Sequence, residues 1–280
     1  MNAEMDRPSP SQNLSAFPPT VPMADAQRPW HNIAIADCGE PLQVIPADEF
    51  ARVQPHPYQV LGAPYGPGVT PFALRAGVLQ ALRLAQQHLQ SLRPGWQLKV
   101  FDAYRPISVQ QFMVDHTFQE LAARAGLAVG TLSPQQRQSI LAQVYQFWAP
   151  PSSDPADAPP HSTGSAIDVT LVSETDRDVD FGSPVDEVSV RSHPDHFARA
   201  TSSAEQAFHR HRLLLQQSML AAGFAPHPRE WWHFSLGDRL WAWRKHQQDP
   251  AFAATARYGR ADLLPVSKQA CLEARPGAQR

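Results

Sequence analysis

The stretch HSTGSAID, residues 161–168, is the one around which this chain is organised. It carries an imidazole, His161, at one end and a carboxylate, Asp168, at the other, with a glycine between them. The later stretch EWWH ends in a second imidazole, His233. Two histidines and one aspartate supply three protein ligands and leave a fourth position to water, which is the arrangement of a catalytic zinc site. The sequence therefore predicts a metal site built by His161, Asp168 and His233.

The residues around Asp168 alternate as they do in a β-strand. Within 166–171, Asp168 and Thr170 share one face, while the apolar residues between them share the other. An apolar face packs on a core, so Asp168 is expected to point the other way, towards a cleft. His161 precedes this strand, and the chain can fold back over Gly164 to bring the imidazole to the carboxylate.

The second stretch also precedes a predicted strand. Pro226 and Pro228 exclude a helix, and residues 231–236 have the composition of a strand. Residues three apart in a strand point to opposite faces. Glu230 and His233 can therefore meet only if Glu230 lies on a bend where the strand begins.

A third motif follows a third strand. Residues 96–100 alternate between apolar and polar, as in a half-buried strand, and lead into DAYRP at residues 102–106. Arg105 is thus expected where a strand ends and a loop begins, a usual place for a functional residue. Taken alone, however, Arg105 is better explained by a structural salt bridge to Asp102.

Four helices are predicted around these strands. Apolar residues recur at helical spacing from Val78 to Leu92, and Pro94-Gly95 ends that helix. Capping-box patterns open two others, at Ser133 and at Ser202. The predicted ranges are 78–92, 108–124, 134–147 and 203–222, and the proline- and glycine-rich segment 55–71 is expected to be a loop.

Composition excludes several classes of function. The formal net charge of −2 over 280 residues gives no electrostatic argument for nucleic acid or an anionic membrane as partner. No apolar run approaches the length of a membrane span, and the first residues lack the pattern of a secretory signal, so a cytoplasmic protein is expected. Cys38 and Cys271 are expected to be free thiols.

The chain divides into a central domain and two tails. Residues 1–30 repeat Pro, Ser and Gln with little apolar periodicity and are expected to be a disordered tail. Residues 31–262 form the predicted catalytic domain, and residues 263–280 form a loose C-terminal tail.

Each motif alone has an ordinary explanation, but their combination and order resemble a known family. HSTGSAID followed by EWWH, with DAYRP upstream, is similar to the zinc D-alanyl-D-alanine dipeptidases of the vancomycin-resistance type. The resemblance covers most of residues 40–260. It implies an α+β fold with a central antiparallel sheet and flanking helices, shared with the D-Ala-D-Ala carboxypeptidases and the hedgehog signalling domain.

The resemblance also implies a role for each residue. It implies that His161, Asp168 and His233 bind one Zn2+ per chain, that Glu230 is the general base, and that Arg105 stabilises the transition state. FGSPVD, residues 181–186, resembles the family segment whose aspartate holds the substrate ammonium, which makes Asp186 the expected amine anchor. The ordinary alternative for Asp186 is a solvated acid in an acidic loop.

One departure from the family concerns the other end of the substrate. The family often has a serine two residues before the first zinc histidine, where its hydroxyl helps to hold the substrate carboxylate. Pro159 occupies that position here and cannot donate a hydrogen bond. The expected function is hydrolysis of D-Ala-D-Ala or a similar small dipeptide. The alternatives are a carboxypeptidase acting on peptidoglycan stems and a non-catalytic, zinc-stabilised binding module. Glu230 and Arg105 favour an enzyme, since a purely structural site needs neither.

Overall fold

The computed structural model describes residues 28–262. The predicted tails 1–27 and 263–280, with Cys271, lie outside the described residues. Residues 28–30, which the sequence assigned to the tail, are described, and the side chain of Trp30 is buried. Cys38 is exposed and free. No helix between residues 28 and 262 is both long and apolar enough to cross a membrane.

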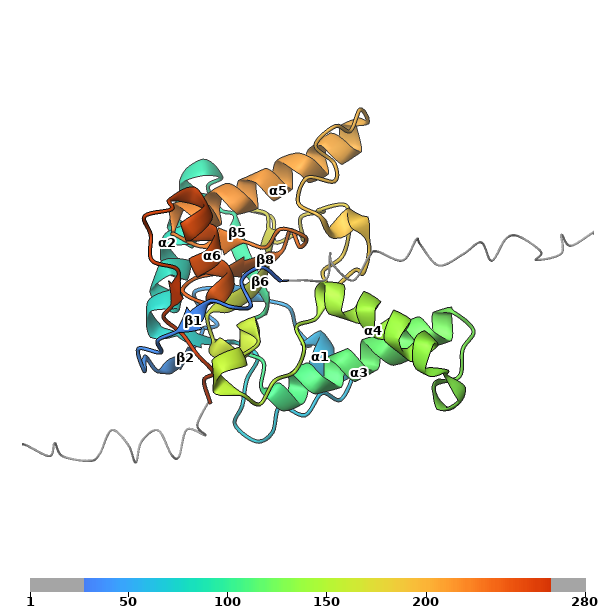
Figure 1. Cartoon of the computed structure of the whole chain (residues 1–280). Coiled ribbons are helices and arrows are strands. Elements are labelled where there is room, and N and C mark those ends of the chain that lie inside the picture. Colours follow the sequence, from blue (N-terminus) through green and yellow to red (C-terminus); the bar gives the residue numbers. More distant parts are fainter. Residues whose placement is uncertain (1–27, 263–280) are drawn as a thin grey trace, which may run out of the picture.

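A five-stranded sheet forms the centre of the fold (Figure 1). Its order is β3-β5-β6-β8-β7, with bounds β3 Ala51–Arg52, β5 Gln97–Asp102, β6 Ala166–Val172, β7 Ala225–Pro226 and β8 His233–Ser235. The neighbours β5, β6, β8 and β7 are antiparallel, whereas the edge strand β3 runs parallel to β5. The predicted α+β class with a mainly antiparallel central sheet is confirmed.

The register of this sheet aligns the three sequence motifs. Asp102 at the end of β5 pairs with Asp168 in β6, and Asp168 pairs with His233 at the start of β8. An irregularity between Val100 and Asp102 shifts the β5–β6 register at this point. Three residues that are far apart in the chain therefore lie side by side across three strands.

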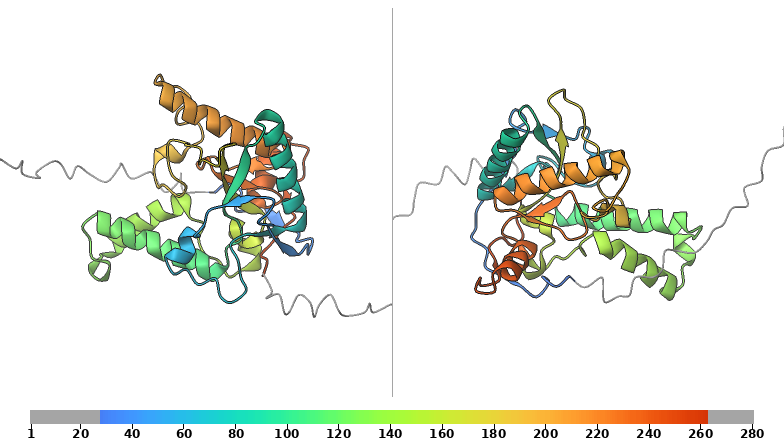
Figure 2. Two further views of the ribbon diagram at one scale, coloured as in Figure 1. Left: turned by 180° about the vertical axis from the view of Figure 1, so that it is seen from behind. Right: turned by 90° about the horizontal axis from the view of Figure 1, so that it is seen from above.

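Two long helices cover the apolar face of the sheet. They are α2, Ala76–Leu92, and α5, Ser203–Ala221, which pack against each other (Figure 2). The apolar residues of β6 alternate with Asp168 as predicted, and they are fully buried in one cluster with residues of both helices. This cluster fixes the sheet and leaves Asp168 pointing away from it.

A second apolar cluster joins a pair of helices that extends to one side of the sheet (Figure 1). They are α3, Ile107–Arg124, and α4, Pro134–Phe147, and the capping box predicted at Ser133 opens α4. The short helix α1, Pro57–Val60, packs here through Tyr58, so the segment predicted as loop contains one helical turn. Proline at its first position is compatible with a helix start.

The remaining elements are short. The strand β2, Leu42–Val44, pairs antiparallel with β4, Ala73–Arg75, and β1, Ala34–Ile35, pairs parallel with β9, Thr255–Ala256. The helix α6, Arg239–Gln248, follows β8, and 3-10 turns include η4, Pro160–Thr163. The strand β8 is shorter than predicted because residues 231–232 form the turn that leads into it.

Candidate active site

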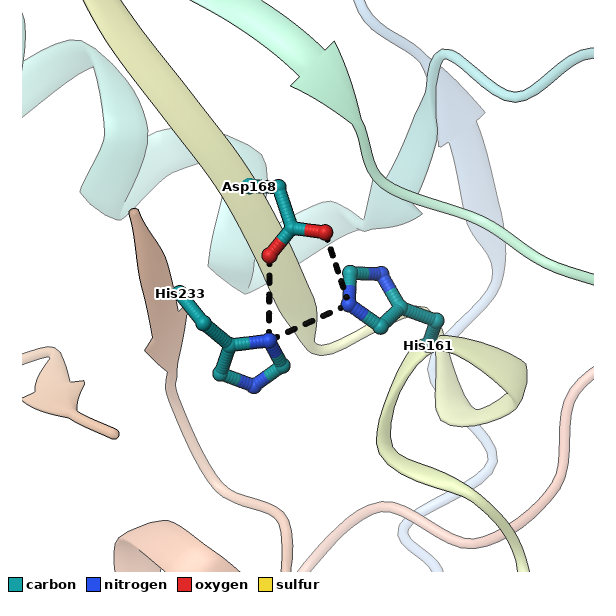
Figure 3. A group of neighbouring side chains, drawn as sticks. All are labelled: His161, Asp168 and His233. Atoms are coloured by element: carbon teal, nitrogen blue, oxygen red, sulfur yellow. Dashed lines mark hydrogen bonds and ion pairs between the residues drawn. The ribbon is translucent and has the colours of Figure 1, made fainter. Parts of the chain in front are cut away.

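Three side chains from separate elements meet at one point (Figure 3). His161 comes from η4, Asp168 from β6 and His233 from β8. His161 Nε2 lies 3.3 Å from Asp168 Oδ2, His233 Nδ1 lies 3.0 Å from Asp168 Oδ1, and the two ring nitrogens lie 3.2 Å apart. Ligands at about 2.0–2.1 Å from a tetrahedral zinc ion are about 3.3 Å from one another. The three atoms are therefore spaced as ligands of a single ion.

The other nitrogen of each ring fixes which atom faces the carboxylate. His161 Nδ1 lies 2.8 Å from the carbonyl oxygen of Ala103, which can only accept, so Nδ1 carries the proton and Nε2 keeps its lone pair. His233 Nε2 lies 3.3 Å from Ser235 Oγ, whose hydroxyl in turn donates to Asp238. Such outer partners orient metal-binding histidines. Two lone pairs and a carboxylate directed at one point suit a cation.

Gly164 produces the fold-back that brings His161 to Asp168. It ends η4 with φ of 70°, in the left-handed region that glycine adopts without steric cost. A Cβ at this position would lie 2.1 Å from Leu42 Cδ2. The glycine between the two ligands is thus required both by the backbone conformation and by the close approach of β2.

Asp168 is ionised in this setting. Burial alone would raise its pKa, but positive charge on His161 and His233, when these rings are protonated, outweighs burial and holds the pKa of this carboxyl well below its usual range, and a cation bound between neutral rings would act in the same direction. A buried carboxylate between two imidazoles remains available as a metal ligand throughout the physiological pH range.

Glu230 lies immediately before the turn into β8, as the strand parity required. Its Oε2 is 3.7 Å from His233 Nδ1, and its Oε1 is 3.6 Å from Nδ1 of His227. Burial, followed by the negative charge of Asp168, raises the pKa of Glu230 well above its usual range. A carboxylate with a raised pKa beside a metal site is suited to accepting a proton.

Arg105 is held rigidly beside the same point. Its guanidinium donates to Asp102 Oδ2 at 2.8 and 3.1 Å and to Gln110 Oε1 at 2.9 Å. The rings of Tyr58 and Trp148 lie 5.1 and 4.9 Å from its central carbon. Its NH2 is 3.6 Å from Asp168 Oδ2. Arg105 therefore forms the structural salt bridge to Asp102 and also lies at the site. The salt bridge holds its guanidinium in this position.

Asp102 was predicted only as a salt-bridge partner of Arg105, and its contacts with His56 and His161 were missed. It is fully buried, accepts a hydrogen bond from Tyr65 Oη at 3.2 Å, and lies 3.3 Å from His56 Nε2 and 3.5 Å from His161 Nδ1. It thus links Arg105 to the environment of His161, a candidate metal ligand. The alternation in β5 could have revealed it, since Asp102 continues the buried face of Leu98 and Val100.

Asp186 lies in the loop after β6, in a left-handed conformation with φ of 64°. Tyr58 Oη donates to its Oδ2 at 2.6 Å. Burial, and then the charge of Asp168, raises the pKa of Asp186 to about 7. The ordinary alternative of a freely solvated acid does not describe this partly buried and hydrogen-bonded carboxyl.

All six residues predicted from the sequence line one pocket. They are Arg105, His161, Asp168, Asp186, Glu230 and His233. The wall also includes aromatic residues and one further cation that the sequence reasoning did not identify, namely Trp30, Phe147, Trp148, Trp232 and Arg28. A pocket that holds three candidate metal-binding side chains, an acid–base group and two cations can bind a small charged substrate next to a metal ion.

Comparisons with known proteins agree with this arrangement. The family model described as D-ala-D-ala dipeptidase matches residues 52–253. A D-alanyl-D-alanine dipeptidase of Synechocystis sp. is 46% identical over 241 residues, covering 84% of this chain and 97% of the relative. One from Escherichia coli is 39% identical over 105 residues, covering 37% of this chain and 50% of the relative.

A solved structure of the LdcB LD-carboxypeptidase covers 78% of both chains at 17% identity, with a TM-score of 0.39. The residues that the family model matches, 52–253, include every motif described above, and the Synechocystis relative aligns with 84% of the chain. The chain belongs to the D-Ala-D-Ala dipeptidase family of peptidases.

Proposed function

We propose that this protein hydrolyses D-alanyl-D-alanine, or a closely similar small dipeptide, to free amino acids with one zinc ion held by His161, Asp168 and His233. The observation that carries the proposal is the convergence of these three ligand atoms beside Glu230 in one pocket. Family membership and the activity named for the two curated relatives support the choice of substrate.

Each step of the reaction has a candidate group. Zinc in this ligand set would supply Lewis-acid activation of the attacking water and of the scissile carbonyl. Glu230 takes the proton of that water and passes it to the leaving amine, a role typically worth ~10²–10⁴-fold in rate. Arg105 presents a fixed guanidinium to the negative charge that develops on the carbonyl oxygen. Asp186 pairs with the free ammonium of the dipeptide.

Two alternatives differ in what the pocket must recognise. A carboxypeptidase acting on longer stems has no free ammonium next to the scissile bond, so a carboxylate such as Asp186 in the pocket favours a dipeptidase. A zinc-stabilised binding module requires neither a buried Glu230 nor a clamped Arg105. Both features favour an enzyme over a binding module.

A hydrolysis assay with three substrates tests the proposal. D-Ala-D-Ala should be cleaved, while L-Ala-L-Ala and N-acetyl-D-Ala-D-Ala should be cleaved much more slowly. Metal analysis should find about one zinc per chain, and a chelator should abolish turnover until zinc is restored. Full activity in a metal-free preparation would refute the zinc site, and preference for the N-acetyl substrate would favour the carboxypeptidase.

A further inference from the structure

A cation from the start of the described chain reaches the active-site pocket. Arg28 lines this pocket together with Glu230 and His233, although it precedes every strand of the sheet. The neighbouring Trp30 is buried, with its ring 5.6 Å from that of His227 and 5.2 Å from that of Trp243. This aromatic packing holds the segment over the pocket.

A second contact holds the same segment from its other side. His31 Nε2 lies 3.4 Å from Asp157 Oδ1, and Arg239 donates to the same oxygen at 2.9 Å. The segment 28–31 is thus attached both to the residues beside Glu230 and to the loop that leads into the metal ligand His161. Arg28 is positioned by these neighbours and not by a regular element of its own.

The Arg28 guanidinium is available for a ligand. Within residues 28–262, its one hydrogen bond runs from NH2 to the carbonyl oxygen of Tyr145, at 3.3 Å. Burial lowers the pKa of Arg28 to about 10 against the opposing charge of Glu230, so the group remains cationic at neutral pH. Arg105, the other cation in the pocket, already donates to Asp102, Gln110 and Tyr58, and the proposed function directs it at the carbonyl oxygen and not at the substrate carboxylate.

One part of the neighbouring wall supplies no backbone donor to an anion. Pro159 and Pro160, which precede the metal ligand, have no backbone N–H. Arg28 lines an adjoining pocket together with both prolines, and Pro160 also lines the active-site pocket. A guanidinium therefore lies beside the two residues that have no backbone N–H, and it can bind a carboxylate through two parallel hydrogen bonds.

We propose that Arg28 binds the α-carboxylate of the substrate and so makes the free C-terminus a condition for tight binding. A dipeptide of two neutral residues carries one ammonium and one carboxylate, and the pocket provides Asp186 for the first and Arg28 for the second. This inference rests on the proposed function, because it needs a peptide whose scissile bond is followed by a free C-terminal residue.

The test compares D-Ala-D-Ala with its C-terminal amide, D-alanyl-D-alaninamide, on the wild type and on Arg28→Met. Losing a hydrogen-bonded charge should raise KM for the dipeptide by ~10–100-fold with a smaller change in kcat. KM for the amide should hardly change, so the preference for dipeptide over amide should fall by the same ~10–100-fold factor. Arg28→Lys keeps the charge but cannot form the two parallel hydrogen bonds of a guanidinium, so its preference for dipeptide over amide should lie between those of the wild type and Arg28→Met.

Controls separate binding from folding and from effects on Glu230. Arg93→Met removes an exposed arginine outside the pocket and should leave the preference unchanged. Thermal midpoint and zinc content should match between Arg28→Met and wild type. An equal fall in kcat on both substrates would mean that Arg28 acts through Glu230, and an unchanged preference would overturn the carboxylate contact. A wild type that cleaves neither substrate would refute the proposed function itself, and this inference with it.

Discussion

The two walls of the pocket are held in place by different forces. The sheet wall comprises Asp168 and His233, which backbone pairing of β6 with β8 aligns, and His161, which the turn η4 before β6 places beside them. The helix wall comprises α1, α3, α4 and the segment 28–31, and it is held by side-chain packing in a separate apolar cluster and by the contacts of Trp30. A hydrogen-bonded ladder fixes spacing closely, whereas packed side chains leave room for variation.

The two walls are expected to contribute differently to the reaction, one to the chemical step and the other to substrate binding. Glu230 and Arg105, which lie at the exits of the sheet, are expected to set kcat, although Arg105 also contacts Gln110 of the helix wall. Groups that are held by residues of the helix wall are expected to set KM. Asp186, which accepts a hydrogen bond from Tyr58, is one of them. Substitutions in each wall therefore test whether the effects on kcat and KM divide in this way.

The largest effect is expected from Glu230→Gln. The amide cannot accept the proton of the attacking water, so kcat should fall by ~10²–10⁴-fold while one zinc per chain is retained. Steady-state kinetics together with metal analysis measure both. Glu120→Gln, on the exposed side of α3, is the matched control. An unchanged kcat would remove Glu230 from the mechanism.

Arg105→Lys should have the next largest effect. Lysine cannot reproduce the forked contacts with Asp102 and Gln110, so the charge facing the developing oxyanion is misplaced. We expect kcat to fall by ~10²–10³-fold. A variant with normal kcat but a lowered melting temperature would mean that Arg105 has only a structural role, through its salt bridge to Asp102.

Asp186→Asn should act on binding and not on chemistry. Replacing the carboxylate removes the partner of the substrate ammonium, so KM for D-Ala-D-Ala should rise by ~10–100-fold. KM for the N-acetylated dipeptide, which has no ammonium, should stay the same. Comparable increases for both substrates would contradict the amine anchor.

The same carboxyl predicts a smaller effect of pH. Because burial raises the pKa of Asp186 to about 7, the group is increasingly protonated and neutral as pH falls through that value. The ammonium needs the charged form, so the preference for D-Ala-D-Ala over its N-acetyl form should fall by up to about tenfold per pH unit below 7. Taking the ratio cancels titrations that both substrates share. A ratio independent of pH between 5 and 8 would argue against this titration.

The smallest effect on catalysis is expected from Phe118→Ala in the helix wall. Phe118 is buried in the second cluster, and its truncation should destabilise the fold by ~3–5 kcal/mol. At temperatures where the variant stays folded, zinc content and kcat per folded molecule should match wild type. Denaturant unfolding and kinetics measure the two quantities. Loss of zinc in the folded variant would show that the walls are not independent.

The sequence predicted more of the sheet wall than of the helix wall. Strand alternation around Asp168 and the bend before His233 are local patterns, and the structure contains both. The segment containing Tyr58 was expected to be loop but forms a helical turn, because one turn stabilised by packing leaves no periodic signal. The end of the predicted tail packs at the pocket through Trp30, since a single buried aromatic gives no pattern of its own.

From the sequence alone follow the four long helices, the strands next to the motifs and the three side chains that meet as candidate ligands, and the family resemblance adds the α+β class. Only the tertiary structure decided that Asp102 supports both Arg105 and His161, that Tyr58 holds Asp186, and that Arg28 reaches the pocket. The two groups of features differ in how far apart along the chain the interacting residues lie. Strand and helix patterns arise between residues a few positions apart, whereas these contacts join distant segments and exist only once the sheet register and the two apolar clusters have formed.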